Sequence, residues 1–130
     1  MMSEKPASGP KAIVAGHGSF AEGIRSAVEQ ISGRGDCFLA VTNAGLGPGE
    51  IEARLREALD ATGAHLIFTD LPAGSCTIAA RKLQRERHDL TVVTGAALPT
   101  ILSFACGGDI TKAAEQGRAA LTVLEAPRDA

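Results

Sequence analysis

Short apolar runs alternate along the chain with longer segments in which apolar residues recur every three or four positions. That longer spacing lines one face of an amphipathic helix, whereas short runs rich in β-branched residues are typical of buried strands. No turn signal of a hairpin joins one run to the next, so strands and helices are predicted to alternate as βαβ units in a parallel sheet. The four predicted strands are residues 11–15, 37–42, 66–69 and 90–94.

The predicted helices are bounded by recognisable capping residues. The first begins at Ser19, with Glu22 at capping-box spacing, and ends at Gly33. The residues expected on its buried face are Ile24, Ala27, Val28 and Ile31. The other helices are expected from near Pro48 to Gly63, over residues 75–86 and 98–105, and after Asp109, which would cap the last one.

The strand cores are continuously apolar, as expected of strands covered by helices on both faces. This predicts an α/β, doubly wound, four-stranded parallel sheet in the order 2-1-3-4, with right-handed crossovers. A final apolar run at residues 121–124 is a possible fifth, antiparallel strand. Residues 11–125 are expected to form a single domain between two flexible tails, residues 1–10 and 126–130.

Composition excludes several classes of function. Aromatic residues make up 3% of the 130 positions and the net charge is −2, which argues against nucleic acid as a partner. No apolar stretch approaches a membrane span and no signal sequence precedes the first strand. The three cysteines, Cys37, Cys76 and Cys106, lack the spacing of a metal site and are expected to be small buried side chains. A cytoplasmic protein without a metal or other cofactor is therefore expected.

Glycine and polar residues follow every predicted strand, as GHGS, TNAG, TDLPAGS and TGAALP. The carboxyl ends of parallel strands share one edge, and ligands bind there at the point where the winding reverses. His17 follows the first strand and Asp70 the third, so the order 2-1-3-4 makes them neighbours at that point. His65 and His88 precede strands and fall on the opposite edge.

A histidine beside a carboxylate has a definite chemical use. The carboxylate accepts a hydrogen bond from one ring N–H and leaves the other nitrogen as a nucleophile, and it balances the charge that follows phosphorylation. Gly18 and Ser19, at one helix N-terminus, and Gly74 and Ser75, at another, could bind a phosphate. The structural alternatives stay open here: a loop histidine, an aspartate that ends a strand, and two serines that cap helices.

The ordered set AIVAGHGSFAEGI, TDLPAGS, VVTGAALPTIL and EQGRAALTVL resembles the IIA component of mannose-family sugar phosphotransferase systems, from about residue 11 to 124. The resemblance implies that His17 accepts a phosphoryl group, that Asp70 is its hydrogen-bonding partner and that Ser75 lies beside the phosphate. It further implies a doubly wound fold whose last strand crosses to a partner subunit. Ala73, Cys76 and Ala97 depart from the family's usual Gly, Pro and Asn, at the edge that a partner protein would contact.

The function implied is that of a phosphohistidine carrier, formally a phosphotransferase. It would accept a phosphoryl group from HPr and pass it to a separate IIB protein, without a cofactor, and would meet the membrane only through the transporter components. A homodimer is expected, because an unpaired final strand would leave an exposed edge. Asp70 is expected to be an exposed carboxylate whose replacement leaves the fold intact.

Three other readings stay open. The first is a regulatory IIA-like protein without a transporter of its own. The second is the subunit that phosphorylates dihydroxyacetone kinase, which shares the fold and the histidine. The third is a small tetrapyrrole metal chelatase, in which a GHGS turn supplies a metal ligand, although this class usually places a second histidine on the same edge.

Overall fold

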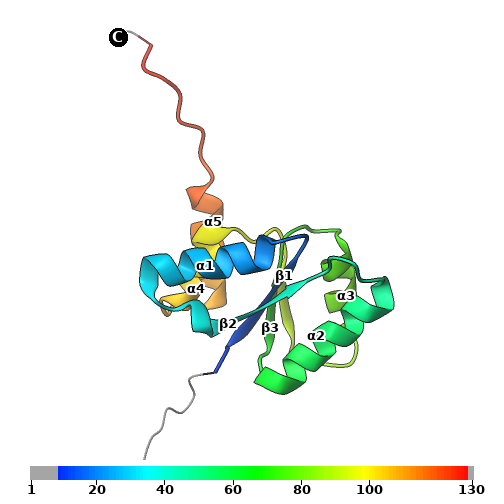
Figure 1. Cartoon of the computed structure of the whole chain (residues 1–130). Coiled ribbons are helices and arrows are strands. Elements are labelled where there is room, and N and C mark those ends of the chain that lie inside the picture. The colour runs from blue at the N-terminus through cyan, green and yellow to red at the C-terminus, as the bar shows by residue number, and fades with distance from the viewer. Residues whose placement is uncertain (1–8, 129–130) are drawn as a thin grey trace, which may run out of the picture.

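The computed structural model describes residues 9–128. Over these residues four strands alternate with helices, the last two of the five α-helices are consecutive, and a short 3-10 helix, η1, precedes the second strand (Figure 1). In chain order the elements are β1 Ala12–Gly16, α1 Phe20–Ser32, η1 Gly35–Cys37, β2 Phe38–Thr42, α2 Pro48–Thr62, β3 Leu66–Thr69, α3 Ser75–Gln84, β4 Thr91–Val93, α4 Leu98–Ala105 and α5 Ile110–Ala120. Residues 1–8 and 129–130 of the two predicted tails lie outside the described range.

The sheet confirms the predicted topology. Its order is β2-β1-β3-β4 and all three strand pairs are parallel. Gly16, the last residue of β1, pairs with Thr42, the last residue of β2, and Ala15 pairs with Thr69, the last residue of β3. The three strands therefore end at the same level, which places the loops that follow them along one edge.

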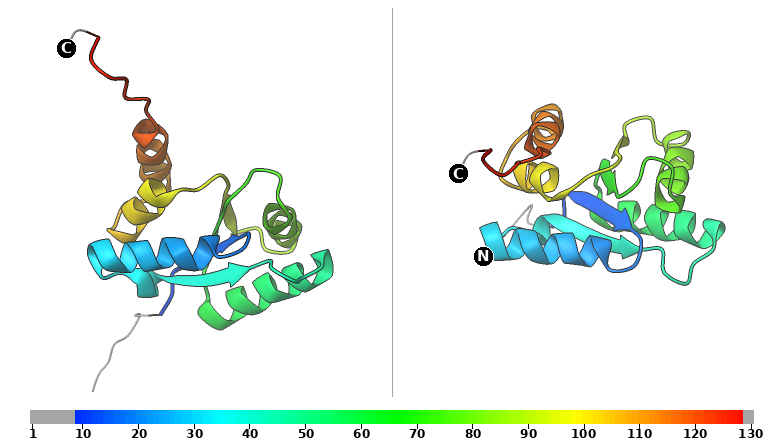
Figure 2. Two further views of the ribbon diagram at one scale, coloured as in Figure 1. Left: turned by 45° about the horizontal axis from the view of Figure 1, so that its top comes forward. Right: turned by 90° about the horizontal axis from the view of Figure 1, so that it is seen from above.

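Alternate residues of β1 face two separate cores. Ile13 and Ala15 pack under α2 and α3, whereas Ala12 and Val14 pack under α1 and α4. Figure 2 shows these two helix pairs on opposite faces of the sheet, with α5 stacked on α4. All residues of β1 are buried, which accounts for its continuously apolar sequence.

Two details of the predicted helices are wrong. Ser19 is the N-cap of α1, but its hydroxyl makes no capping bond because its backbone lies outside the extended region in which a cap side chain reaches the first turn. Glu22 pairs with Arg25 instead. Ile31, expected in the core, is 59% exposed, because the buried face of α1 runs through Ala21 and Val28, and Ile31 lies to one side of it.

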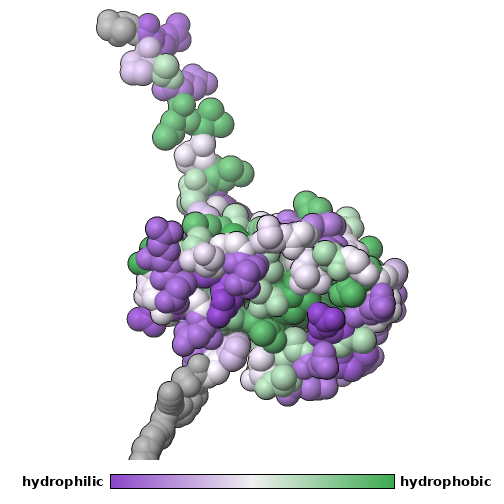
Figure 3. Space-filling view, in the orientation of Figure 1, coloured by the Kyte–Doolittle hydropathy of each residue, from purple (hydrophilic) through white to green (hydrophobic). Residues whose placement is uncertain are grey.

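The apolar run at residues 121–124 forms no strand in this single chain. It leaves α5 as an extended segment that stands away from the domain (Figure 1), and Figure 3 shows hydrophobic residues along it. Leu121, Val123 and Leu124 are each more than 80% exposed. A strand needs a neighbouring edge, and this segment meets none within its own chain, so pairing of these residues remains a prediction about a dimer.

The cysteines differ in their surroundings. Cys76 is buried and Cys37 half-buried, but Cys106 is exposed, so the expectation of burial is wrong for that residue. Cys106 directly follows the last turn of α4, beyond the part of that helix that packs on the sheet.

Candidate functional site

His17 and Asp70 meet at the carboxyl edge of the sheet, where β1 and β3 end. The register of these strands brings Asp70, one residue after Thr69, beside the turn that follows Gly16. The Oδ2 atom of Asp70 accepts two hydrogen bonds from His17, one from the backbone N–H at 2.9 Å and one from Nδ1 of the ring at 2.8 Å. The carboxylate thus holds both the backbone and the ring of the histidine.

Gly16 makes this close approach possible. A Cβ atom at this position would lie 3.0 Å from Cγ of Asp70 and 2.6 Å from the ring of Phe20. A side chain here would push against the Asp70 carboxylate and force the ring of Phe20 to shift, so the first glycine of GHG lets the carboxylate lie against the chain.

Asp70 is more buried than the sequence suggests. Its side chain is 11% exposed, whereas that of His17 is 50% exposed. Burial acts to raise the pKa of Asp70, but the hydrogen bonds from the backbone and ring of His17 outweigh it and lower this pKa below its ordinary value. The expectation of an exposed carboxylate is therefore wrong, because the His17 turn and α3 cover it.

The bond to Asp70 fixes the role of each ring nitrogen. With Asp70 ionised, Nδ1 carries the proton that the carboxylate accepts, so Nε2 of the neutral ring keeps its lone pair. Nε2 makes no hydrogen bond to any residue in the described range, and half of the side chain is exposed. In the neutral form of the ring, this geometry leaves Nε2 as the nitrogen with a free lone pair.

The turn that carries His17 is fixed by β2. Gly18 has φ +52°, a left-handed conformation that glycine adopts without strain. Its carbonyl accepts a hydrogen bond of 2.8 Å from the hydroxyl of Thr42, the last residue of β2. Ser19 follows at the N-terminus of α1, where no side-chain oxygen caps the free N–H groups of the first turn.

Gly74 and Ser75 form the other side of the site. Gly74 is the N-cap of α3, and a Cβ atom there would lie 3.1 Å from Cε1 of the His17 ring. Ser75 is the first residue of α3 and does not cap it, so the interpretation of this serine as a capping residue is wrong. Its hydroxyl instead accepts a hydrogen bond of 2.8 Å from the side-chain amide of Asn43.

Sequence reasoning missed the residues that hold these loops. Asn43 lies in the TNAG segment after β2, but only its contact with Ser75 sets it apart from an ordinary turn residue. Thr77 donates a hydrogen bond to the carbonyl of Leu71 and accepts one from Thr69, which ties the 70–74 loop to the end of β3.

Cys76 stands where the family usually has proline. It is fully buried near Asp70, and burial together with that negative charge raises the pKa of its thiol to about 11. A thiol with this pKa stays protonated at neutral pH and is a poor nucleophile. Cys76 therefore contributes a neutral, apolar group beneath the site.

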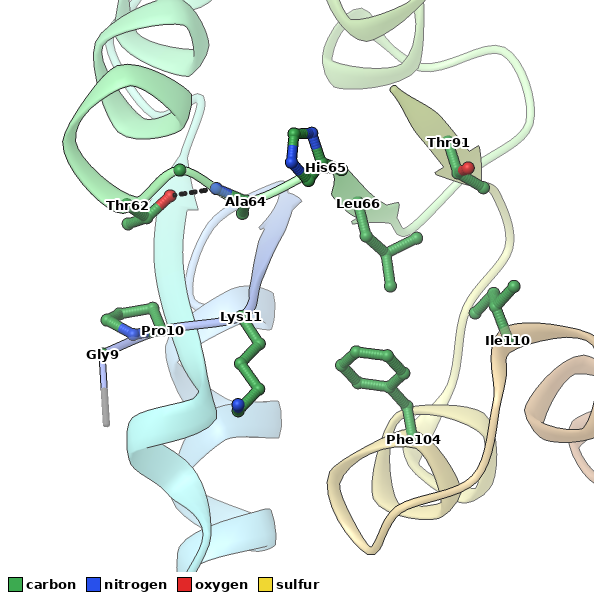
Figure 4. Close-up of a pocket in the computed structure, with 11 residues that line it drawn as sticks. Gly9, Pro10, Lys11, Thr62, Ala64, His65, Leu66, Thr91, Phe104 and Ile110 are labelled. Carbon is green, nitrogen blue, oxygen red and sulfur yellow. Dashed lines mark hydrogen bonds between the residues drawn. The ribbon is translucent and has the colours of Figure 1, made fainter. Parts of the chain in front are cut away.

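The opposite edge of the sheet holds a hollow of about 540 Å³, away from His17 (Figure 4). Leu66, Phe104 and Ile110 form much of its apolar wall, and Lys11 lies beside it. His65 lies at its rim, with Nδ1 2.9 Å from Asp89. His88 is also at this edge, where its ring lies 3.2 Å from the carbonyl of Arg85.

Residues 9–128 contain neither a metal-binding cluster nor a membrane-spanning helix. No group of three or more His, Cys, Asp or Glu side chains in that range could hold a metal ion. No helix in the same range is long and apolar enough to span a bilayer.

Comparison with solved structures places the fold among phosphotransferase IIA proteins. The chain superposes on a mannose/sorbose-specific IIA subunit from Enterococcus faecalis with a TM-score of 0.78 and 22% identity, covering 92% of this chain and 98% of that one. A IIA protein associated with the fucose utilization operon of Streptococcus pneumoniae gives a TM-score of 0.79 at 20% identity, with coverage of 88% and 93%. An EIIA component from Streptococcus agalactiae gives 0.67 at 23% identity, with coverage of 84% and 89%.

A comparison with curated protein sequences found no match. A family profile does match, over residues 11–120, and its description is "PTS system fructose IIA component", EIIA-man. This match spans all four strands and all five helices, including both halves of the His17 site. The chain therefore belongs to the EIIA-man family of phosphotransferase system IIA components.

Proposed function

We propose that this protein is a phosphohistidine carrier, which accepts a phosphoryl group from HPr on Nε2 of His17 and passes it to a separate IIB protein. The observation that carries the proposal is the hydrogen bond between Nδ1 of His17 and the partly buried carboxylate of Asp70. It leaves Nε2 as the nucleophile of a half-exposed ring. Membership of the IIA family supports phosphoryl transfer as the general chemistry.

The transfer needs no cofactor. The lone pair of Nε2 attacks phosphorus in the phosphohistidine of HPr, a new N–P bond forms, and the N–P bond of the donor breaks. The donor imidazole leaves with the electron pair of that bond. His17 keeps its proton on Nδ1, so its ring becomes cationic next to the Asp70 carboxylate, which stabilises this charge.

The phosphoryl oxygens would lie between two helix N-termini. Gly18 and Ser19 at α1, and Gly74 and Ser75 at α3, flank the ring of His17, and neither helix has a side-chain cap. Backbone N–H groups at such ends attract anions, and the hydroxyl of Ser75 adds a further donor. We assign phosphate binding to these four residues.

A homodimer belongs to the same proposal. The outer edge of β4 has no partner strand among the described residues, and the exposed apolar segment 121–124 has no place to pack in its own chain. Exchange of this segment onto the sheet of a second copy would cover both features. Sedimentation at micromolar concentration should show a dimer, and a monomer would contradict this part of the proposal.

The decisive experiment is a phosphorylation assay with phosphoenolpyruvate, enzyme I and HPr from the same organism. Mass spectrometry under conditions that preserve acid-labile phosphohistidine should locate one phosphate on His17. Addition of the IIB protein should then remove the label. A phosphate on His65 or His88, or no label at all, would contradict the proposal.

A further inference from the structure

We infer that Asn43 is a positioning residue of the phosphorylated state, which acts through Ser75 by directing the serine hydroxyl toward the phosphoryl group on His17. The inference rests on the proposed function, because it concerns the phosphohistidine that this function forms. It deepens that function by adding Asn43, the residue that follows β2, to the groups that stabilise the phosphorylated protein.

The backbone of Asn43 is held firmly at the end of β2. Its N–H donates to the carbonyl of Gly16 at 3.1 Å, which continues the pairing of β1 and β2 by one residue. Its own carbonyl accepts a hydrogen bond of 3.0 Å from the N–H of Leu46. These two bonds fix the backbone from which the side chain of Asn43 extends, so ordering of the side chain costs only its own rotamer freedom.

The side chain of Asn43 crosses to the other half of the site. Its Nδ2 atom donates to Oγ of Ser75 at 2.8 Å, in a partly buried position, although the two residues are 32 positions apart in the chain. Ser75 follows Gly74, against which the ring of His17 lies. One hydrogen bond therefore links the end of β2 to the wall of the histidine site.

The direction of this bond decides the role of Ser75. A serine hydroxyl has one proton to donate and two lone pairs that accept. The amide of Asn43 occupies a lone pair, so the hydroxyl proton is not used on Asn43 and remains available for another acceptor. An anion beside His17 at the start of α3 would be such an acceptor, and hydrogen bonds to charged groups are the strong ones.

A carboxylate at position 43 would reverse the arrangement. In Asn43→Asp the side chain keeps its shape but can only accept, so it would take the proton of Ser75 away from the phosphate. It would also add a negative charge near the phosphoryl group. Asn43→Ala, in contrast, would remove the orienting bond without adding charge, so its effect should be smaller.

The equilibrium of phosphoryl exchange between HPr and this protein tests the inference. That equilibrium constant compares the free and phosphorylated forms of each protein, so it does not depend on how tightly the two proteins dock. We expect Asn43→Asp to lower the constant by about tenfold or more, the scale of one hydrogen bond to a charged group, and Asn43→Ala by roughly threefold.

A double substitution shows whether Asn43 acts through Ser75. Ser75→Ala removes the hydroxyl donor itself and should lower the constant at least as much as Asn43→Ala, and the two changes together should lower it no further than Ser75→Ala alone, because residues in one network are not additive. Gln84→Ala is the matched control, since it removes a side-chain amide hydrogen bond of 2.8 Å, to the carbonyl of Leu90 at the opposite edge. It should leave the constant unchanged.

The outcomes separate this inference from the proposed function. If the wild-type protein takes no phosphate on His17, the proposed function fails and the role of Asn43 fails with it. If the wild-type protein is phosphorylated on His17 and the folded Asn43 variants share its equilibrium constant, only the role of Asn43 is overturned. Additive losses in the double variant would also overturn it, because Asn43 would then act independently of Ser75.

Discussion

The two edges of the sheet each carry a histidine paired with an aspartate, and the distances are almost the same. Nδ1 of His17 lies 2.8 Å from Asp70, and Nδ1 of His65 lies 2.9 Å from Asp89. The surroundings differ, because the side chain of Asp70 is 11% exposed and that of Asp89 is 69% exposed. Pair distance alone therefore does not identify a reactive histidine.

Backbone contacts make the difference between the two pairs. Asp70 also accepts the backbone N–H of His17, and glycines at positions 16 and 74 allow the chain to close around the pair. The His65 pair lies on an open surface, where solvent competes for both partners and holds the ring less firmly. We therefore expect the histidine of the enclosed pair, His17, to be phosphorylated and the histidine of the open pair, His65, to remain unmodified. Four predictions test the difference between the two pairs.

The largest expected difference is between two single substitutions, each of which replaces one of these histidines by alanine. His17→Ala should abolish labelling by phospho-HPr, because it removes the only nucleophile we place at the site. His65→Ala should be labelled like the wild-type protein. Mass spectrometry of both variants after the same incubation makes the comparison, and reduced labelling of His65→Ala would show that the amino edge takes part.

The two aspartates should differ nearly as much. Asp70→Asn keeps the size of the side chain but can no longer balance a cationic ring, so the rate of phosphoryl transfer should fall by ~10²-fold. Asp89→Asn should leave that rate unchanged. Rapid-quench measurements of phosphoryl transfer from HPr give both rates, and equal rates in the two variants would contradict the role of enclosure.

A substitution at Gly74 tests how closely the start of α3 must pack against the ring of His17. In Gly74→Ala the new methyl group would lie 3.1 Å from Cε1 of His17, so the ring must shift, and transfer should slow by roughly tenfold. Gly49→Ala is the matched control, since a Cβ atom there meets no atom within 4 Å at the start of α2. Transfer at the wild-type rate in Gly74→Ala would show that the ring tolerates displacement.

The smallest effect concerns stability and pH. The pKa of Asp70 is lowered in the folded state, so its ionised form stabilises the fold above the unfolded pKa, about 3.9. This stabilisation is lost as the pH falls through the lowered pKa. The difference in free energy of unfolding between wild type and Asp70→Asn should thus be largest near neutral pH and should decrease as the solution becomes acidic. Urea unfolding at several pH values measures it, and a constant difference would contradict the assignment.

The sequence was sufficient to predict the edge on which His17 and Asp70 meet. The apolar runs identify the strands, and the carboxyl ends of parallel strands all lie at one edge of the sheet. The loops that follow the strands therefore come together at that edge, whatever side chains they carry. The contact between Asn43 and Ser75 could not be predicted in the same way, because it depends on the direction of two side chains in irregular loops. The unused capping hydroxyl of Ser19 was missed for the same reason, since the spacing of a motif does not fix the backbone angles of its first residue.

The bond between His17 and Asp70 joins residues 53 positions apart, which follow two strands that are not consecutive in the chain. A nascent or unfolded chain contains both residues but not the pair, because the pair exists only after β1 and β3 have aligned. If the proposed function holds, acceptance of a phosphoryl group by His17 therefore requires a completed fold. Unfolded copies of the chain would then consume no phosphoryl groups from HPr.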